Sequence, residues 1–193
     1  MNWRNSIEGY GLISILLHWL VAVAVVALFA LGLWMVELTY YHPWYRDAPH
    51  IHKSVGLLLF GVMLLRLVWR YANPRPRLLA STLEARVAVS AHLLMYALSF
   101  AVLVSGYLIS TADGRAIEVF DFFSVPATLS GYPQQEDTAG LIHELLAYAL
   151  LGLSSLHAMA SLKHHFIDRD ATLTRILRPY AATTNTLPRE EKQ

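Results

Sequence analysis

Five histidines lie within or just inside long apolar stretches of this 193-residue chain. They are His18, His52, His92, His143 and His157. Ionisable side chains inside a bilayer are costly and usually functional. A single histidine of this kind reads equally well as a hydrogen-bonded core residue, whereas five together indicate a set of ligands. The chain has no cysteine, which excludes iron–sulfur clusters, covalent haem attachment and thiolate chemistry.

Each of these histidines lies 14 residues from another histidine, an arginine or a glycine. The interval is nearly four helical turns, so both members lie on one face of a helix, about 21 Å apart along its axis. The four pairs are His143 with His157, His52 with Arg66, His18 with Gly32, and His92 with Gly106. If successive helices alternate in direction, the residues form two layers. The outer layer holds His52, His143, Gly32 and Gly106, and the inner layer holds His18, His92, His157, Arg66 and Arg70.

Two histidines at one level on different helices of a bundle suit bis-imidazole ligation of haem. His52 and His143 form this pair in the outer layer, because His50 is turned about 200° away from His52. The inner layer offers three histidines for two axial positions, and spacing does not choose among them. Glycines opposite the histidines would make room for a macrocycle, and Arg66 and Arg70 could neutralise its propionates.

A histidine-lined metal transporter and a haem-binding scaffold without catalysis are the alternatives of another class. A transporter normally adds acidic ligands at mid-depth and broken helices. Here Glu144 is the only carboxylate deep in an apolar stretch. Haem is therefore the favoured ligand.

The elements that must position these side chains are four apolar blocks, each near the roughly 20 residues that a spanning helix needs. Hydrophobic residues make up 55% of the chain and charged residues 15%, against about 25% charged in soluble domains. We predict an all-α protein, a bundle of four transmembrane helices within a single domain over residues 1–178, and a polar tail over 179–193. The net charge of +1 gives no indication of a nucleic-acid partner. The predicted helices are Leu12–Val36, His50–Trp69, Val87–Thr111 and Leu141–Phe166.

Lysine and arginine predict the orientation of the bundle, since cytoplasmic connections are enriched in them. Most of the 15 lie in the N-terminal segment, the second connection, the adjoining helix ends and the tail, which places both termini in the cytoplasm. The opposite side holds only Arg46, Lys53 and Arg115. The third connection is acidic and faces outward, with Asp113, Glu118, Asp121, Glu136 and Asp137.

Over residues 8–178 the chain resembles the bacterial cytochrome b561 family of four-helix dihaem membrane proteins. The resemblance rests on the order and spacing of Ser14–Trp19, His50–Gly56, Arg66–Arg70 with Pro74, His143–Leu145, His157, and His164–Phe166. It implies two haem b groups, an inner one between His18 and His157 and an outer one between His52 and His143. His92 would then support the inner haem, or serve as an alternative ligand. His164 matches a position at a cytoplasmic-side quinone pocket, although an interfacial histidine beside Lys163 explains it equally well.

The resemblance further implies a multi-pass protein of the bacterial inner membrane that moves electrons between the periplasmic face and ubiquinone. Some family members resemble superoxide oxidases, and Arg46, Lys53 and Arg115 could attract the superoxide anion. The acidic third connection would repel superoxide unless it folds away. The alternative is quinol-linked transfer to a periplasmic redox protein, docked on that connection and its aromatic residues, Phe120, Phe122, Phe123 and Tyr132.

Overall fold

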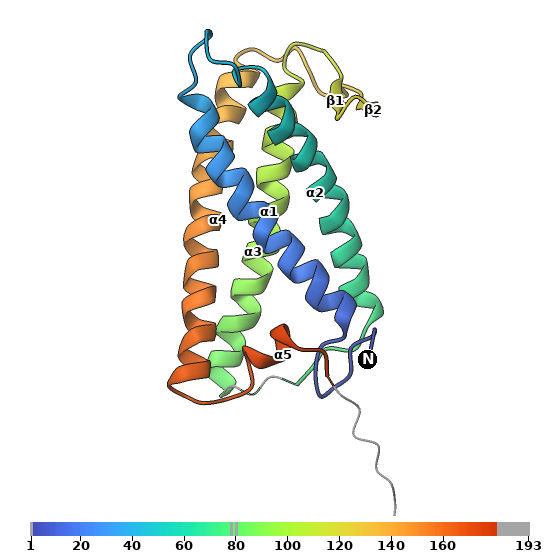
Figure 1. Cartoon of the computed structure of the whole chain (residues 1–193), viewed down its shortest axis with the longest axis vertical. Helices are drawn as coiled ribbons and strands as arrows, with labels where there is room; N and C mark the ends of the chain where they lie inside the picture. Colours follow the sequence, from blue (N-terminus) through green and yellow to red (C-terminus); the bar gives the residue numbers. More distant parts are fainter. Residues whose placement is uncertain (1, 78, 80, 181–193) are drawn as a thin grey trace, which may run out of the picture.

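The computed structural model describes residues 2–77, 79 and 81–180, and four long helices dominate it (Figure 1). They are α1 (Leu12–Val36), α2 (Asp47–Ala72), α3 (Thr82–Ser110) and α4 (Gln135–Phe166). Each is long and apolar enough to cross a membrane, which confirms the predicted all-α, four-transmembrane-helix architecture. The predicted polar tail over 179–193 lies outside the described residues from residue 181 onward.

The helix bounds differ from the predicted ones wherever a helix continues into polar sequence. Helix α1 has the predicted bounds, whereas α2 begins at Asp47 and α4 at Gln135, each ahead of its apolar block. Helix α3 begins at Thr82 because Ser81 and Glu84 form a capping box. The Ser81 hydroxyl accepts the Glu84 backbone N–H, and the Glu84 carboxylate accepts the Ser81 N–H. Hydropathy alone therefore predicts the apolar part of each helix, and the polar first turns of α2, α3 and α4 lie outside it.

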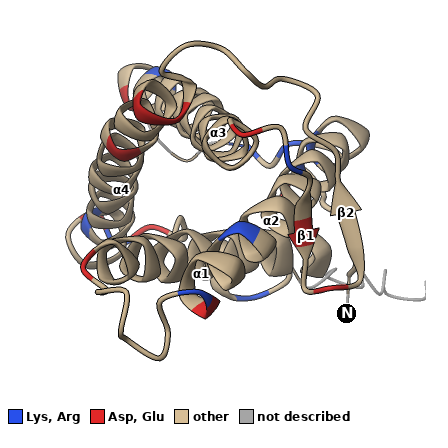
Figure 2. Cartoon of the chain, turned by 90° about the horizontal axis from the view of Figure 1, so that it is seen from above, with Lys and Arg blue, Asp and Glu red and all other residues tan. Residues whose placement is uncertain are grey.

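Seen from above, the four helices form a ring in chain order, so each packs beside its neighbours in sequence (Figure 2). One end of the ring carries the N-terminal segment, the α2–α3 connection and the short helix α5 (Thr174–Leu177), and is called the terminal end here (Figure 1). The other end, called the hairpin end, carries the α1–α2 and α3–α4 connections. Both ends of the described chain therefore lie on the same side of the bundle.

An apolar cluster joins α1, α2 and α3 between these two ends. Val21 of α1 packs against Leu59 and Met63 of α2, and Met63 is 1% exposed. Tyr96 and Phe100 of α3 lie against the same cluster. Because lipid is as apolar as these side chains, close packing is what holds such helices together in a membrane. The cluster separates the polar residues of the two ends.

A small β-hairpin, not predicted from the sequence, lies in the α3–α4 connection. Its strands β1 (Ile117–Val119) and β2 (Phe123–Val125) are antiparallel, with Phe120 and Asp121 in the left-handed region at the turn. The Ser54 hydroxyl of α2 accepts the Phe120 N–H at 3.1 Å, and Val119 is 1% exposed. These contacts hold the hairpin against the flank of α2, beside the ring of helices (Figure 2).

Candidate functional site

At the hairpin end, His52 of α2 and His143 of α4 face each other across the bundle. Their ring centroids are 6.1 Å apart and the rings are inclined at 69°. Helix α2 contributes His52 near its beginning, and α4, which runs in the same direction, contributes His143 near its own beginning at the same end. The structure thus brings together the pair that the 14-residue spacing places in one layer.

Hydrogen bonds leave one nitrogen of His143 available. Its Nδ1 lies 2.9 Å from the Val102 carbonyl oxygen, which can only accept, so Nδ1 carries the proton and Nε2 is bare. Ser105 approaches the same Nδ1 at 3.2 Å. A backbone carbonyl on the distal nitrogen is the usual way in which a ligating histidine is oriented. Nδ1 of His52 is buried and, among the described residues, has no hydrogen-bond partner.

Two glycines make room for these rings. A Cβ atom on Gly106 of α3 would lie 3.1 Å from Cε1 of His143, and one on Gly32 of α1 would lie 3.3 Å from Cε1 of His52. Both distances are shorter than ordinary van der Waals contact. The sequence predicts that these glycines leave space for a macrocycle. In the structure the space beside each glycine is taken by an imidazole ring, so a larger residue there would displace the ring.

Three histidines gather toward the terminal end. The ring centroids of His18 (α1) and His157 (α4) are 6.5 Å apart, inclined at 65°. His92 of α3 is closer to His157, with centroids 5.1 Å apart. The inner layer is therefore a contiguous group of three imidazoles, as the spacing predicts.

Two arginines and a tyrosine adjoin these three rings. A guanidinium nitrogen of Arg66 lies 3.0 Å from Nδ1 of His18. The guanidinium carbons of Arg66 and Arg70 lie 5.3 and 5.5 Å from the ring centroid of Tyr96. Within the described part of the chain, neither arginine forms an ion pair with a carboxylate. Sequence reasoning missed Tyr96, although it follows His92 by one helical turn on α3.

His164 belongs to a separate charged group where α4 ends, which we call the His164 cluster (Glu84, Lys163, His164, Asp168 and Asp170). Its Nδ1 lies 3.0 Å from an Asp168 carboxylate oxygen and 2.9 Å from one of Asp170. Lys163 contacts Asp168 at 2.7 Å and Glu84 of α3 at 3.5 Å. The ligand atoms of Glu84, His164 and Asp168 are close enough to hold a cation, but the Lys163 ammonium already provides that charge.

Asp170 owes its place in this cluster to the turn that follows α4. Burial alone would raise the pKa of Asp170, but hydrogen bonds from Thr172 and the adjacent His164 bring that pKa below its ordinary value. The carboxylate accepts the Thr172 backbone N–H at 2.7 Å through its other oxygen. Asp170 is therefore ionised beside His164 at neutral pH.

The three cations predicted for the hairpin end differ in their partners. Arg115 donates to the Asp113 carboxylate at 2.7 Å, and this hydrogen bond holds the pKa of Asp113 below its usual range. Arg46 and Lys53, at the beginning of α2, are exposed and form no ion pair with any described residue. Of the three, as far as the described part of the chain shows, Arg46 and Lys53 are the ones that offer an uncompensated positive charge to an approaching anion.

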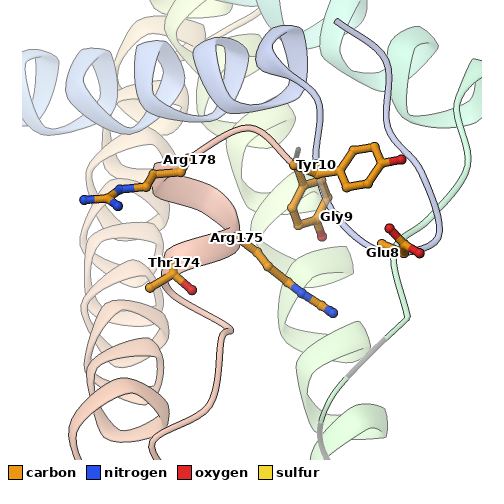
Figure 3. Close-up of a pocket in the computed structure, with 7 residues that line it drawn as sticks. Glu8, Gly9, Tyr10, Thr174, Arg175 and Arg178 are labelled. Atoms are coloured by element: carbon orange, nitrogen blue, oxygen red, sulfur yellow. The ribbon is translucent and has the colours of Figure 1, made fainter. Parts of the chain in front are cut away.

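The N-terminal segment and the α5 segment close over the terminal end. The Trp19 indole N–H donates to the Ile176 carbonyl at 3.0 Å, and the Tyr180 N–H donates to the Tyr10 carbonyl at 3.1 Å. Between the segments lies a pocket of about 280 Å³, with Glu8 and Tyr10 on one side and Arg175 and Arg178 on the other (Figure 3).

The donor set fits a haem of the b type. It offers opposed imidazoles, a bare nitrogen on His143, an unpartnered buried nitrogen on His52 and arginines without acidic partners. With no cysteine in the chain, thioether attachment of haem and thiolate ligation of its iron are excluded. The fold and site thus define the class of small helical membrane cytochromes that hold b-type haem.

The chain belongs to the prokaryotic cytochrome b561 family, whose sequence model matches residues 9–179. It is 49% identical over 179 residues to cytochrome b561 homolog 2 of Escherichia coli (strain K12), covering 92% of this chain and 95% of that protein. The probable superoxide oxidase CybB of Yersinia pestis is 28% identical over 175 residues, covering 87% and 95%. Cytochrome b561 homolog 1 of Escherichia coli is 26% identical over 172 residues, covering 85% and 94%.

This membership confirms the family suggested by the sequence motifs. The protein is a multi-pass bacterial membrane cytochrome of electron transport that binds b-type haem. The metal-transporter alternative is set aside, because the family is one of redox cytochromes.

Proposed function

We propose that this protein carries two haem b groups, ligated by His52 with His143 and by His18 with His157, and passes electrons from periplasmic superoxide to ubiquinone. The observation that carries the pairing is the separation of the rings. A metal–imidazole bond of about 2 Å, with the ring centre about 1 Å beyond the nitrogen, separates two axial ring centres by roughly 6 Å. The two pairs are 6.1 and 6.5 Å apart.

The same measure argues against His92 as an axial ligand opposite His157. Their ring centres are 5.1 Å apart, which is too close for an iron between them. We therefore assign His92 to the support of the inner haem, near Arg66 and Arg70. Those arginines suit the propionates, because a guanidinium pairs with a carboxylate through two parallel hydrogen bonds.

Each haem, when bound, supplies reversible one-electron chemistry, and the chain positions it and sets its surroundings. Leu59 and Met63 are buried between the two histidine layers, and the half-buried Phe100 packs against them. A dry, low-dielectric interior strengthens the effect of Arg66 and Arg70 on any charge placed beside them. The side chains thus bind the cofactor, orient it and bias its charge state.

The positive-inside bias supports a cytoplasmic terminal end and a periplasmic hairpin end, in the bacterial inner membrane. Superoxide would then approach past Arg46 and Lys53. The β-hairpin is docked on α2 at Ser54, next to Lys53, and lies beside the ring of helices (Figure 2). Of the five acids of the third connection, it carries Glu118 and Asp121. The 28% identical relative is named a probable superoxide oxidase, which is a further support for superoxide as the donor.

Quinol-linked transfer to a periplasmic protein is the second candidate, favoured by exposed aromatic side chains near the acids of the third connection. Phe122 is 88% exposed and Tyr132 is 63% exposed. Aromatic residues are enriched at protein interfaces, whose rims are polar. The 49% identical relative carries a name that specifies neither donor nor acceptor.

Stopped-flow spectroscopy of the purified, haem-loaded protein tests the proposal. Superoxide mixed with the oxidised protein should reduce haem, and a water-soluble ubiquinone analogue should reoxidise it. Pyridine haemochrome quantification should give a ratio of about two haems per chain. If superoxide does not reduce the haem but a quinol analogue does, the result favours the second candidate, quinol-linked transfer to a periplasmic protein. A ratio of one haem per chain would overturn the relay.

A further inference from the structure

The pocket at the terminal end contains none of the histidines, and we propose that it binds the headgroup of a phosphatidylethanolamine molecule from the leaflet that borders this end. In this proposal Arg175 donates to the lipid phosphate, and Glu8 accepts from the ethanolamine ammonium. The acyl chains stay in the bilayer beside α5. Binding of this lipid is independent of the haem ligands and of ubiquinone.

The pocket lies at the depth of the membrane surface. Its walls are the residues just before α1 and the α5 segment. The Trp19 indole N–H donates to the Ile176 carbonyl at 3.0 Å, so α5 packs beside the first turns of α1 rather than beyond its end. Helix α1 contains no Asp, Glu, Lys or Arg, and tryptophan is enriched where a bilayer meets water. The level of α5 is therefore that of the lipid headgroups.

Exposed apolar side chains accompany the charged residues on both walls. Ile7, which precedes Glu8, is 57% exposed, and Leu177, between Arg175 and Arg178, is 50% exposed. Elements that lie in the membrane interface combine the two kinds of side chain, because the apolar ones enter the acyl region while the charged ones stay among the headgroups. A small anion in water would leave the apolar side chains without a partner. A lipid satisfies both kinds.

Arg175 is the cation that the fold fixes at the pocket. The residue is half-buried, and its Nη1 donates to the Arg77 carbonyl at 2.8 Å. A guanidinium has several N–H groups, so this bond orients the side chain and leaves other donors for a ligand. Within the ranges 2–77, 79 and 81–180, Arg175 forms no ion pair with a carboxylate. Guanidinium groups suit phosphate oxygens, because two parallel hydrogen bonds can form.

Glu8 gives the opposite wall a negative charge. The Arg175 side chain extends toward the side of the pocket on which Glu8 lies, whereas Arg178 points outward (Figure 3). As far as the structure describes the chain, the two charges form no ion pair across this space. A zwitterion fits such an arrangement. Phosphoethanolamine joins a phosphate to an ammonium with N–H donors, whereas the choline ammonium has none and the glycerol headgroup is uncharged.

The size of the pocket and the surrounding charge also fit a headgroup. The volume of about 280 Å³ is near the lower limit of small-molecule sites, roughly 300–1,000 Å³, which leaves no room for acyl chains. Hydrogen bonds join the N-terminal segment, the α2–α3 connection and the α5 segment around it. In the described parts of 2–11, 73–79 and 171–180, Glu8 is the only acid beside five arginines, Arg4, Arg75, Arg77, Arg175 and Arg178. This field attracts a phosphate at the membrane surface, and Glu8 then selects the headgroup.

The test is lipid binding by the haem-loaded full chain in detergent, measured by native mass spectrometry. Phosphatidylethanolamine, phosphatidylglycerol and phosphatidylcholine with the same acyl chains are titrated separately. The unmodified protein should bind one phosphatidylethanolamine about tenfold more tightly than either other lipid. Arg175→Gln, which keeps an N–H for the Arg77 carbonyl, should weaken that binding about tenfold. Arg86→Gln is the matched control, since it removes an exposed arginine from the same end of the bundle but outside the pocket, and it should bind like the unmodified protein.

A second variant, Glu8→Gln, tests the ammonium half of the site. The Glu8 side chain is exposed, so its replacement should leave the fold and the haem content unchanged while phosphatidylethanolamine loses most of its advantage over phosphatidylglycerol. If Arg175→Gln loses haem, Glu8→Gln decides the matter by the same comparison of lipids.

Three results would overturn the proposal. Equal binding by Arg175→Gln and Arg86→Gln would mean that the lipid meets only a generally basic surface. A preference for phosphatidylglycerol in the unmodified protein would exclude the ethanolamine assignment. Soluble glycerophosphoethanolamine, which lacks acyl chains, should compete at least about 100-fold more weakly than the lipid, because each buried methylene group adds to membrane affinity. Competition equal to that of the lipid would mean that the ligand comes from water and not from the bilayer.

Discussion

A guanidinium nitrogen of Arg66 lies 3.0 Å from Nδ1 of His18. Arginine only donates, so this contact makes Nδ1 the acceptor and leaves the proton of a neutral His18 on Nε2. A neutral imidazole that binds iron through Nε2 carries its proton on Nδ1 instead. If His18 ligates the inner haem as proposed, the two roles of Nδ1 are incompatible, so haem binding would release Arg66 from His18. The released guanidinium is then available to a carboxylate, such as a propionate.

The charge of Arg66 should therefore set the potential of the inner haem. Replacing Arg66 with methionine keeps an unbranched side chain and removes the charge, which favours the ferric state. We expect the reduction potential of one haem to fall by about 30–60 mV, where 59 mV corresponds to a tenfold change for one electron. Optical redox titration measures both potentials. Arg66→Lys, which retains the charge, should move the potential less, and two unchanged potentials in Arg66→Met would exclude this role.

Single histidine replacements should separate ligands from neighbours. His143→Ala or His52→Ala should remove one haem and leave the other, and His157→Ala should do the same in the inner layer. His92→Ala should retain both haems, because its ring centre is too close to that of His157 to share an iron. The haem-to-protein ratio, with absorption spectra of each variant, provides the measurement. Loss of a haem in His92→Ala, with both retained in His18→Ala, would reverse the inner assignment.

The close approach of Gly106 to His143 predicts a steric effect at the outer site. A Cβ atom there would lie 3.1 Å from His143 Cε1, so Gly106→Val has to displace the ring. We expect the outer haem to be lost in most molecules and the inner haem to be retained. Gly61→Val on α2 is the control, because its Cβ would meet nothing within 4 Å. If both variants retain the full haem content, the glycine is only a helix-packing residue.

Much of this arrangement could be predicted from the sequence because it repeats along single helices. A long apolar block fixes a spanning helix, and the 14-residue interval fixes which side chains share its face. Alternating directions then place His52 level with His143, and the structure brings those rings to 6.1 Å. Choosing among His18, His92 and His157 needed distances between helices, which no pattern within one helix contains.

The features that escaped prediction depend on contacts between segments distant in the sequence. The β-hairpin is held by Ser54, which precedes Phe120 by more than 60 residues, and its turn uses non-glycine residues in the left-handed region. Asp168 follows His164 by one helical turn, a detectable signal, but Asp170 reaches the same nitrogen only through the left-handed Arg169. Tyr96 belongs to the site through Arg66 and Arg70, which lie against its ring from another helix, and no pattern within α3 indicates that contact.

The hairpin's attachment to α2 can be tested by removing one hydroxyl. In Ser54→Ala the buried Phe120 N–H loses its acceptor, which typically costs about 1–3 kcal/mol. The loss should appear as faster hydrogen exchange in residues 117–125, measured by mass spectrometry, with exchange in the four long helices unchanged. Ser155→Ala removes a hydroxyl bonded only within α4 and serves as the control. Equal exchange in the hairpin of both variants would show that Ser54 does not hold it.

The three cations at the hairpin end differ in whether a carboxylate neutralises them. This difference predicts how the rate of superoxide association depends on each charge. Arg46 and Lys53 have no acidic partner among the described residues, whereas Arg115 is neutralised by Asp113. Replacing both Arg46 and Lys53 with glutamine should slow the superoxide reaction about three- to tenfold at low ionic strength, since favourable fields raise association rates by at least that much. Replacing the Arg115–Asp113 pair together, Arg115→Gln with Asp113→Asn, removes no net charge and should leave the rate nearly unchanged. Stopped-flow rates of haem reduction at increasing salt concentration measure the effect. The rate of the unmodified protein should fall as salt screens the attraction, and the rate of the double variant should depend much less on salt.

The opposite salt dependence would contradict this prediction. If the rate of the unmodified protein rises with salt, the acids of the third connection dominate and superoxide is repelled from the hairpin end.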